Sequence, residues 1–252
     1  EITRADIGKM DVETVLEKHL KSELGIDEIT GKPFIALEQA AQFVKEILEE
    51  DKDCAPFTIL SLEQNIVADF HGRSISGTID RIDLRDGVVR IVDYKTGKYF
   101  IEDILPEEKV TVVKAFDDPD SSSWPKISIQ LFIYDYLWNS LGNEGTRVYV
   151  KNSMGNYVGS EERKKALLKH KDREFLNSIY CPFMLDAQRN DRISDSSFPK
   201  VHEGRFSQVA FAEFSDRLRS LLDEIGDTGT VFHHRDGCRH CEYCKYETLC
   251  RK

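Results

Sequence analysis

The feature that most constrains the fold is a tight reversal at Asp86-Gly87, in the middle of the stretch GTIDRIDLRDGVVRIVDYKTGK over residues 77–98. Asp-Gly between two strand-like runs is a strong signal for a two-residue β-hairpin. Counting outward from the turn places Asp80 opposite Asp93. Directly opposed side chains lie on one face about 5 Å apart, and like charges in that arrangement are destabilising. The hairpin therefore needs a reason, other than its own stability, to hold two carboxylates together.

Strand alternation divides this hairpin into two faces. We expect the face with Asp80 and Asp93 to turn toward the core, with the two acids and Lys95 at its open end. The other residues of that face are apolar: Ile82, Leu84, Val89 and Ile91. The opposite face is charged, and we expect it to meet solvent. Its residues are Arg81, Asp83, Arg85 and Arg90.

A divalent cation would explain the paired acids. Burying two unpaired carboxylates is costly, and a cation between them removes that cost. Mg²⁺ prefers oxygen ligands and keeps several waters, one of which can become a nucleophile. Lys95 lies two residues beyond Asp93 on the same side, where it could stabilise charge on a phosphate oxygen or help to position or deprotonate the water. The alternative is a surface acid pair offset by arginines, with Lys95 in a salt bridge.

Composition limits the possible partners. The net charge of −10 and the isoelectric point near 5.3 argue against bulk, nonspecific nucleic-acid binding, although a local basic groove stays possible. No run of 18 apolar residues occurs, which predicts no transmembrane helix, and no signal-peptide pattern occurs at the start, so we expect a cytoplasmic protein. The main basic run allows two interpretations, contact with DNA phosphates or a solvated helix face. Its members are Arg163, Lys164, Lys165, Lys169, Lys171 and Arg173.

Periodicity and capping signals predict the remaining elements as an α/β or α+β arrangement. The expected elements are helices over 11–24, 34–50, 125–141, 161–178 and 206–225, a strand, turn and strand over 57–70, and a strand over 145–150. Ser123 and Gly142 mark the ends of the helix over 125–141, which is apolar nearly all round and should be buried. Gln130 and Tyr134 share one face of it, either as a satisfied core pair or as groups that orient a site.

These motifs resemble a known family. Asp80, followed on the adjacent strand by Asp93-Tyr94-Lys95, resembles the PD-(D/E)XK nuclease superfamily, and the fuller pattern GTIDRID…IVDYKTG resembles its RecB-type branch, which includes AddB-type helicase–nucleases. The resemblance implies a restriction-endonuclease-like α/β core, with a mixed central sheet flanked by helices, over residues 1–236 and core motifs within 8–140. It also implies hydrolysis of DNA phosphodiester bonds with Mg²⁺ or Mn²⁺, leaving a 5′-phosphate. Gln130 and Tyr134 match the family's Gln-x-x-x-Tyr motif. The residues expected at the catalytic site are therefore Asp80, Asp93, Lys95, Gln130 and Tyr134.

The resemblance also implies a metal contact from a helix ahead of the sheet. In the RecB branch this is commonly a Gly followed closely by His-x-x-Leu-Glu. Here Gly8 is followed, with a spacing one residue longer, by Glu13 in place of the His and then by Leu16-Glu17. Glu13 is therefore the expected third metal ligand and Glu17 its alternative, while a solvated helix glutamate is the other interpretation.

Four of the six cysteines fall within the last 15 residues, at Cys238, Cys241, Cys244 and Cys250. In a reducing compartment, clustered cysteines more often bind metal than form disulfides. The last three resemble the C-terminal ligands of the iron–sulfur clasp in AddB-type and CRISPR-associated RecB-like nucleases. The fourth ligand is either Cys238 or a cysteine in a missing N-terminal region. Residues 237–252 are thus expected to form a clasp around a 4Fe–4S cluster or Zn²⁺. If the metal is Zn²⁺, His234 or His240 could also be a ligand.

The predicted function is a metal-dependent deoxyribonuclease, an exonuclease rather than an endonuclease. The resemblance places it at the end of an AddB-type helicase–nuclease in DNA-end processing and recombinational repair, with DNA and a helicase subunit or helicase domain as partners. Two alternatives stay open. One is a stand-alone CRISPR-associated iron–sulfur exonuclease, and the other is an inactive, metal-clasped module that binds DNA or proteins.

Overall fold

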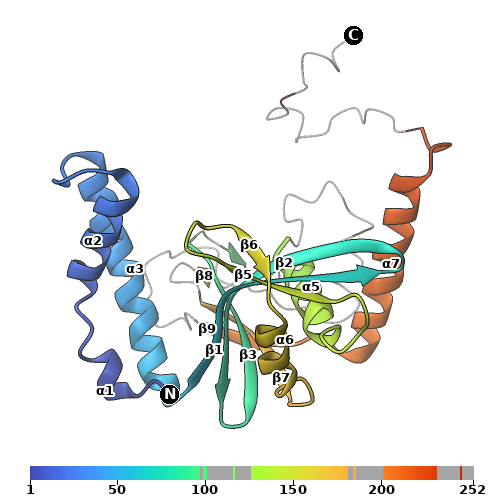
Figure 1. The fold of residues 1–252 in the computed structure, drawn as a ribbon, viewed down its shortest axis with the longest axis horizontal. Coiled ribbons are helices and arrows are strands. Elements are labelled where there is room, and N and C mark those ends of the chain that lie inside the picture. Colours follow the sequence, from blue (N-terminus) through green and yellow to red (C-terminus); the bar gives the residue numbers. More distant parts are fainter. Residues whose placement is uncertain are drawn as a thin grey trace.

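A mixed seven-stranded sheet lies at the centre of the computed structural model, which describes residues 1–96, 99–100, 116, 126–180, 184–185, 201–231 and 245 (Figure 1). The sheet order is β6 (Tyr157–Gly159), β5 (Arg147–Lys151), β1 (Thr58–Phe70), β2 (Arg73–Arg85), β3 (Val88–Tyr94), β7 (Phe175–Tyr180) and β9 (Val201–Gly204). A parallel pair, β4 (Tyr99–Phe100) and β8 (Met184–Leu185), is separate from it. The architecture is the predicted mixed sheet flanked by helices, as in a restriction-endonuclease-like fold.

The helices are arranged in two groups around the sheet (Figure 1). On one side are α1 (Arg4–Ile7), α2 (Val12–Leu24) and α3 (Lys32–Cys54). On the other are α5 (Lys126–Asn139) and α7 (Gln208–Gly226), with α6 (Glu161–Leu168) beside β5. None of the described helices combines the length and apolar character needed to traverse a bilayer.

The predicted hairpin is present, with the register that counting from the turn gives. β2 and β3 pair antiparallel from Arg85 and Val88 to Arg81 and Val92, one step short of the two acids. Asp86 and Gly87 both have positive φ, at 51° and 85°, as a type I′ turn requires. The turn chemistry written in the sequence therefore fixes how these strands align.

Helix α5 is buried as predicted and forms the centre of the main core. Its apolar residues pack on β1 and β2 on one side and on the phenylalanines of α7 on the other. Phe132 stacks on Phe214 with ring centroids 4.2 Å apart. Ser123, the predicted cap, lies outside the described residues. The late helix is also confirmed, as α7.

The charged face of the hairpin is not solvent-exposed, contrary to the sequence prediction. Arg81, Asp83 and Arg90 are all buried, because α3 and the segment after it cover this face. Arg81 binds Asp51 of α3 through two hydrogen bonds of 2.7 and 2.8 Å, and Arg90 binds Asp83 in the same way. Each charge has an opposite partner, which is the condition under which buried ions are tolerated.

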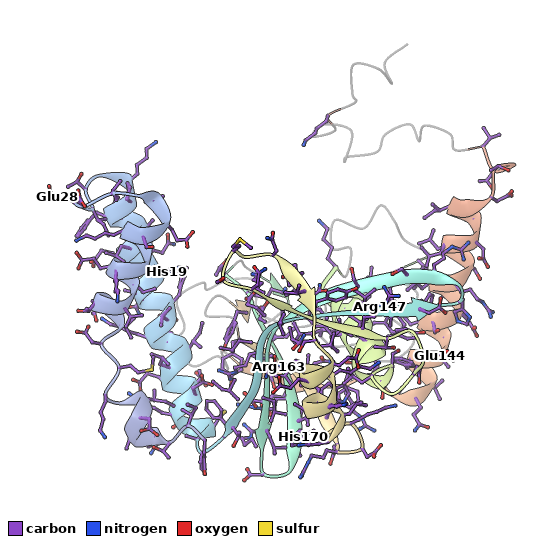
Figure 2. The ribbon with its side chains drawn as sticks, viewed as in Figure 1. His19, Glu28, Glu144, Arg147, Arg163 and His170 are labelled. Carbon is purple, nitrogen blue, oxygen red and sulfur yellow. The ribbon has the colours of Figure 1, made fainter. Side chains whose placement is uncertain are left out.

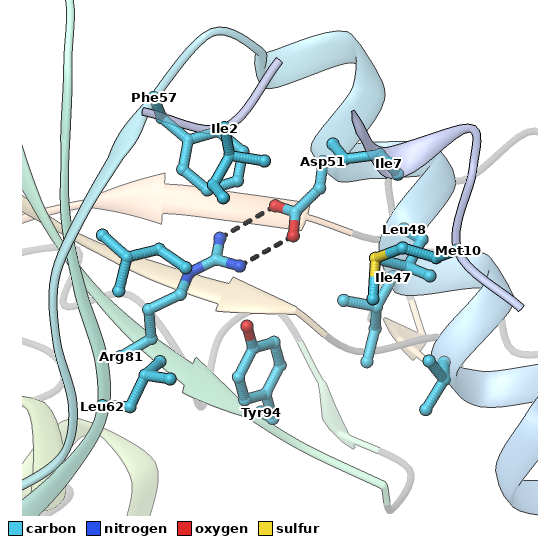
Figure 3. Close-up of a pocket in the computed structure, with 12 residues that line it drawn as sticks. Ile2, Ile7, Met10, Ile47, Leu48, Asp51, Phe57, Leu62, Arg81 and Tyr94 are labelled. Atoms are coloured by element: carbon cyan, nitrogen blue, oxygen red, sulfur yellow. Dashed lines mark hydrogen bonds and ion pairs between the residues drawn. The ribbon is translucent and has the colours of Figure 1, made fainter. Parts of the chain in front are cut away.

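An apolar pocket of about 490 Å³ lies between these N-terminal helices and the sheet (Figure 3). Its walls include Ile7, Met10 and Leu48, and the Asp51–Arg81 ion pair borders it. The hydroxyl of Tyr94 points toward that pair. The N-terminal helices therefore contact the back of the hairpin through the Asp51–Arg81 ion pair, and the apolar pocket lies beside this contact.

Two other predicted elements need correction. The stretch 57–70 is one continuous strand, β1, and not two, since a register shift near Ile59 and the positive φ of Glu63 are absorbed as irregularities. The basic helix expected over 161–178 ends at Leu168, and β7 follows at Phe175. β7 forms because it pairs in parallel with β3, a non-local contact that outweighs local helix preference.

Candidate active site

Three elements position the predicted catalytic residues. Asp80 lies in β2, Asp93 lies near the end of β3, and Lys95 follows β3 directly. Gln130 and Tyr134 come from the face of α5 that packs on β2. The structure brings all five together on one side of the sheet.

Asp93, Lys95 and Gln130 form a closed triangle of polar contacts. Gln130 Nε2 donates to Asp93 Oδ1 at 3.0 Å, and Lys95 Nζ donates to Gln130 Oε1 at 2.7 Å. Lys95 Nζ also lies 2.5 Å from Asp93 Oδ2. A single amide thus uses its donor on the carboxylate and its acceptor on the ammonium group, and fixes both.

Tyr134 extends this network into the backbone of β2. Its hydroxyl accepts a 2.7 Å hydrogen bond from Gln130 Nε2 and donates at 2.8 Å to the carbonyl of Thr78. Burial raises the pKa of Tyr134 well above its usual range, so the hydroxyl stays protonated. Gly77 permits the close approach of α5, since a Cβ there would lie 3.2 Å from Tyr134 Cε1.

Burial and neighbouring charges shift the ionisation of both acids. Burial raises the pKa of Asp93 to about 6, although the charge of Lys95 opposes the rise and the charge of Asp80 adds to it. Burial also raises the pKa of Asp80, while the N–H of Tyr94, which donates to Asp80 Oδ2 at 2.9 Å, lowers it. Holding both acids ionised in this place is therefore unfavourable without additional positive charge.

This arrangement suits a hard divalent cation. Asp93 Oδ2 is buried and receives no well-directed hydrogen bond, and Lys95 is its charge partner. Carboxylate oxygens are the ligands that Mg²⁺ prefers. Within the described residues, however, no three His, Cys, Asp or Glu side chains converge closely enough to enclose a metal ion. The two acids can supply two ligands, and a third carboxylate from the described residues would have to move toward them.

Glu13, the expected third ligand, is not brought to this site. Its carboxylate forms an ion pair with Lys45 of α3 and its side chain is 58% exposed. Glu17 pairs in the same way with Lys21, at 2.7 Å. Figure 2 shows α2, labelled at His19, in the outer helical pair and away from the strands. Val12 is the buried residue of α2, so the helix turns its glutamates outward.

The basic run divides into structural and exposed members. Arg163, labelled in Figure 2, donates to the carbonyl of Leu60 at 3.0 Å, and Lys164 donates to the carbonyl of Thr146 at 2.5 Å. These two side chains hold α6 against β1 and the segment before β5. Lys165 and Lys169 are exposed, which fits both interpretations of this run, contact with DNA phosphates and a solvated helix face.

Sequence analysis missed one acid beside the site, Glu63 of β1. Leu62 pairs with Arg81 and Gln64 pairs with Ile79, which leaves Glu63 beside Asp80. The signal was present in the sequence, because His71-Gly72 forms a second turn with positive φ at both residues. Counting from that turn would have given this alignment.

The cysteines predicted to form the clasp, Cys238, Cys241, Cys244 and Cys250, lie outside the described residues. Among the described residues, Cys54 is a free thiol at the end of α3. Arg85 donates to its sulfur at 3.0 Å, which makes it part of the charged face behind the hairpin. The structure gives it no role at the candidate active site.

A mixed sheet that presents two carboxylates and a lysine on adjacent strands, under a buried helix with Gln and Tyr, defines a nuclease-type α/β domain. The chain belongs to the PD-(D/E)XK nuclease superfamily, whose family model matches residues 5–251. Nucleases of this superfamily typically use Mg²⁺ or Mn²⁺ and act on DNA. Searches among curated proteins and among solved structures gave no match.

Proposed function

We propose that this chain is a Mg²⁺-dependent DNA nuclease of the RecB/AddB type, which hydrolyses phosphodiester bonds. The observation that carries the proposal is the polar network of Asp93, Lys95 and Gln130 beside Asp80. An acid pair with raised pKa values, beside an ordered ammonium group, is an arrangement that a merely structural hairpin does not need.

In this proposal Asp80 and Asp93 hold the cation, which when bound supplies a polarised water and neutralises charge on the phosphate. Lys95 carries a positive charge at the same place and would stabilise charge on a phosphate oxygen. Gln130 fixes the orientation of Lys95, and Tyr134 fixes that of Gln130 through the Thr78 carbonyl. The two α5 residues therefore act as positioning groups.

The test is degradation of linear DNA with Mg²⁺ by wild type, Asp93→Asn and Lys95→Met. Asp172→Asn and Lys18→Met are matched controls, since both residues are exposed and remote from the network. We expect both site variants to lose at least about 100-fold in rate, consistent with the loss of an electrostatic catalytic group, while the controls keep wild-type rates. Equal background rates for all five proteins would contradict the proposal.

The wider context that we propose is an AddB-type helicase–nuclease of the cytoplasm, in DNA-end processing and recombinational repair. The pattern GTIDRID…IVDYKTG supports this branch of the superfamily. Exonuclease action is the expected mode, with a helicase subunit or helicase domain as partner. Comparing linear with covalently closed circular plasmid tests the mode, because an exonuclease leaves the closed circle intact.

We further propose that the cysteine-rich tail binds a 4Fe–4S cluster, with Zn²⁺ as the alternative metal. The family match extends through this tail to residue 251, and the spacing of Cys241, Cys244 and Cys250 suits thiolate ligation. Anaerobically purified protein should be brown and absorb at about 400 nm, as iron–sulfur clusters bound by cysteine thiolates do. Metal analysis that finds neither iron nor zinc would contradict the clasp.

A further inference from the structure

Three acids form one row across three neighbouring strands. In the register of β1 and β2, the residues on either side of Glu63 pair with those on either side of Asp80, so Glu63 lies beside Asp80. The register of β2 and β3, continued by one residue, places Asp80 opposite Asp93. Each alignment is set by its own left-handed two-residue turn, at His71-Gly72 and at Asp86-Gly87. The strand register that brings Asp80 and Asp93 together thus also places Glu63 next to Asp80.

The backbone at Glu63 is irregular where this row begins. Its φ is +48°, a conformation that costs a non-glycine residue about 1 kcal/mol. Non-glycine residues in this region often mark a functional constraint.

The side chain of Glu63 is exposed and weakly held. It is 57% exposed, and it pairs with Lys151 of β5, with Nζ and Oε2 3.5 Å apart. An exposed ion pair at that distance contributes little, typically about 0–1 kcal/mol. A glutamate held this weakly can exchange Lys151 for a cation at small cost.

We propose that Glu63 supplies the third carboxylate of the metal site, in the place predicted for Glu13, and that Lys151 holds it at the rim until the metal binds. In their present positions Glu63, Asp80 and Asp93 do not converge closely enough to enclose a cation, so the proposal requires the Glu63 side chain to turn toward the two aspartates. Asp93 Oδ2 is buried without a directed hydrogen bond. Glu63 is the acid that the sheet register places next to them, whereas Glu13 is tied to Lys45. This inference rests on the proposed function, since it concerns the same site.

The experiment is titration of the full chain with Mn²⁺, which reports free ion by electron paramagnetic resonance without any nuclease assay. Glu63→Gln should weaken Mn²⁺ binding about 10-fold or more, as removal of a supporting group at a metal site does. Lys151→Gln should tighten binding up to about five-fold, since it removes a weak competitor. Glu13→Gln, with the same change in net charge, should bind as wild type.

Two further variants separate the possible failures. Asp93→Asn should abolish binding; if it does not, the proposed function fails. If Asp93→Asn abolishes binding but Glu63→Gln leaves it unchanged, or if Glu13→Gln weakens it instead, only the present inference is overturned. Glu63→Gly should keep or raise the melting temperature of the metal-free protein while it weakens Mn²⁺ binding. A variant that loses both stability and binding would instead assign Glu63 a structural role.

Discussion

At the scale of single residues, Gln130 connects the two charged groups of the site. Its amide donates to Asp93 and accepts from Lys95, and no apolar residue can do both. Gln130→Leu keeps a similar volume but releases both groups, so we expect kcat on linear DNA to fall about 10–100-fold, the usual effect of losing a supporting residue at a metal site. Gln39→Leu, on the exposed surface of α3, is the control. A Gln130→Leu enzyme with normal kcat would show that Lys95 and Asp93 orient themselves.

Asp135, one turn away from Leu131, is a second residue with an unusual environment. It is buried, and Asn177 donates to its Oδ1 at 2.6 Å. Burial raises the pKa of Asp135 to about 7, although hydrogen bonds from Asn177 and the backbone of Phe206 oppose the rise. The folded protein therefore holds a proton here that the unfolded chain, with a pKa of about 3.9, has already lost.

This difference makes the free energy of unfolding depend on pH. Between about pH 4 and pH 7 the folded state binds more protons, so stability falls as pH rises, by up to about 1.4 kcal/mol per unit. Asp135→Asn cannot titrate, so its disadvantage relative to wild type should shrink from pH 5 to pH 7.5. Urea unfolding in EDTA at several pH values measures this, with Asp93 contributing equally to both proteins. A constant difference between the two proteins would contradict the raised pKa.

At the scale of elements, the hairpin depends on the left-handed conformation at Gly87. A Cβ at this position would meet nothing closer than Arg173 at 3.9 Å, so Gly87→Ala tests the backbone conformation alone. We expect a loss of about 1–2 kcal/mol in the free energy of unfolding. Gly159→Ala in β6, with ordinary φ and its nearest contact at 4.0 Å, should change stability by about 0.5 kcal/mol or less, or raise it slightly. Equal losses for both variants would contradict the turn assignment.

Elements that depend on turn residues and local hydrophobic pattern were predictable from the sequence, and elements that depend on contacts between distant segments were not. The Asp86-Gly87 turn fixed the hairpin register, and the apolar character of α5 predicted its burial. β7 was assigned to a helix because a basic run precedes it, and only its parallel pairing with β3 makes it a strand. The site residues behaved in the same way. Asp80, Asp93 and Lys95 were predictable because they lie on one hairpin or directly after it, whereas the position of Glu63 depends on a second turn, His71-Gly72, from which the register was not counted.

At the scale of the whole molecule, the N-terminal helices are held to the sheet by a buried charge network. Asp51 of α3 binds Arg81 of β2 (Figure 3). Tyr180 of β7 donates to Asp51 at 3.1 Å, and Arg90 donates to Tyr180 at 2.8 Å. This network was not predictable from the sequence, because Asp51 and Arg81 are thirty residues apart and strand alternation alone predicted that Arg81 faces solvent. Directed hydrogen bonds between side chains therefore hold the face behind the acids as well as the face that carries them.

Breaking this network on one side should be far more costly than replacing it. Asp51→Leu leaves the Arg81 guanidinium buried without its main partner, and we expect a loss of about 3–5 kcal/mol in the free energy of unfolding. Arg81→Met leaves Asp51 with the hydroxyl of Tyr180, and should also destabilise the protein. The double variant Asp51→Leu/Arg81→Met buries no unpaired charge from this pair, so its loss should be smaller than that of Asp51→Leu alone. Urea unfolding of all four proteins gives the coupling energy between the two residues. If the two losses simply add, Asp51 and Arg81 act independently, and the ion pair does not join α3 to the sheet.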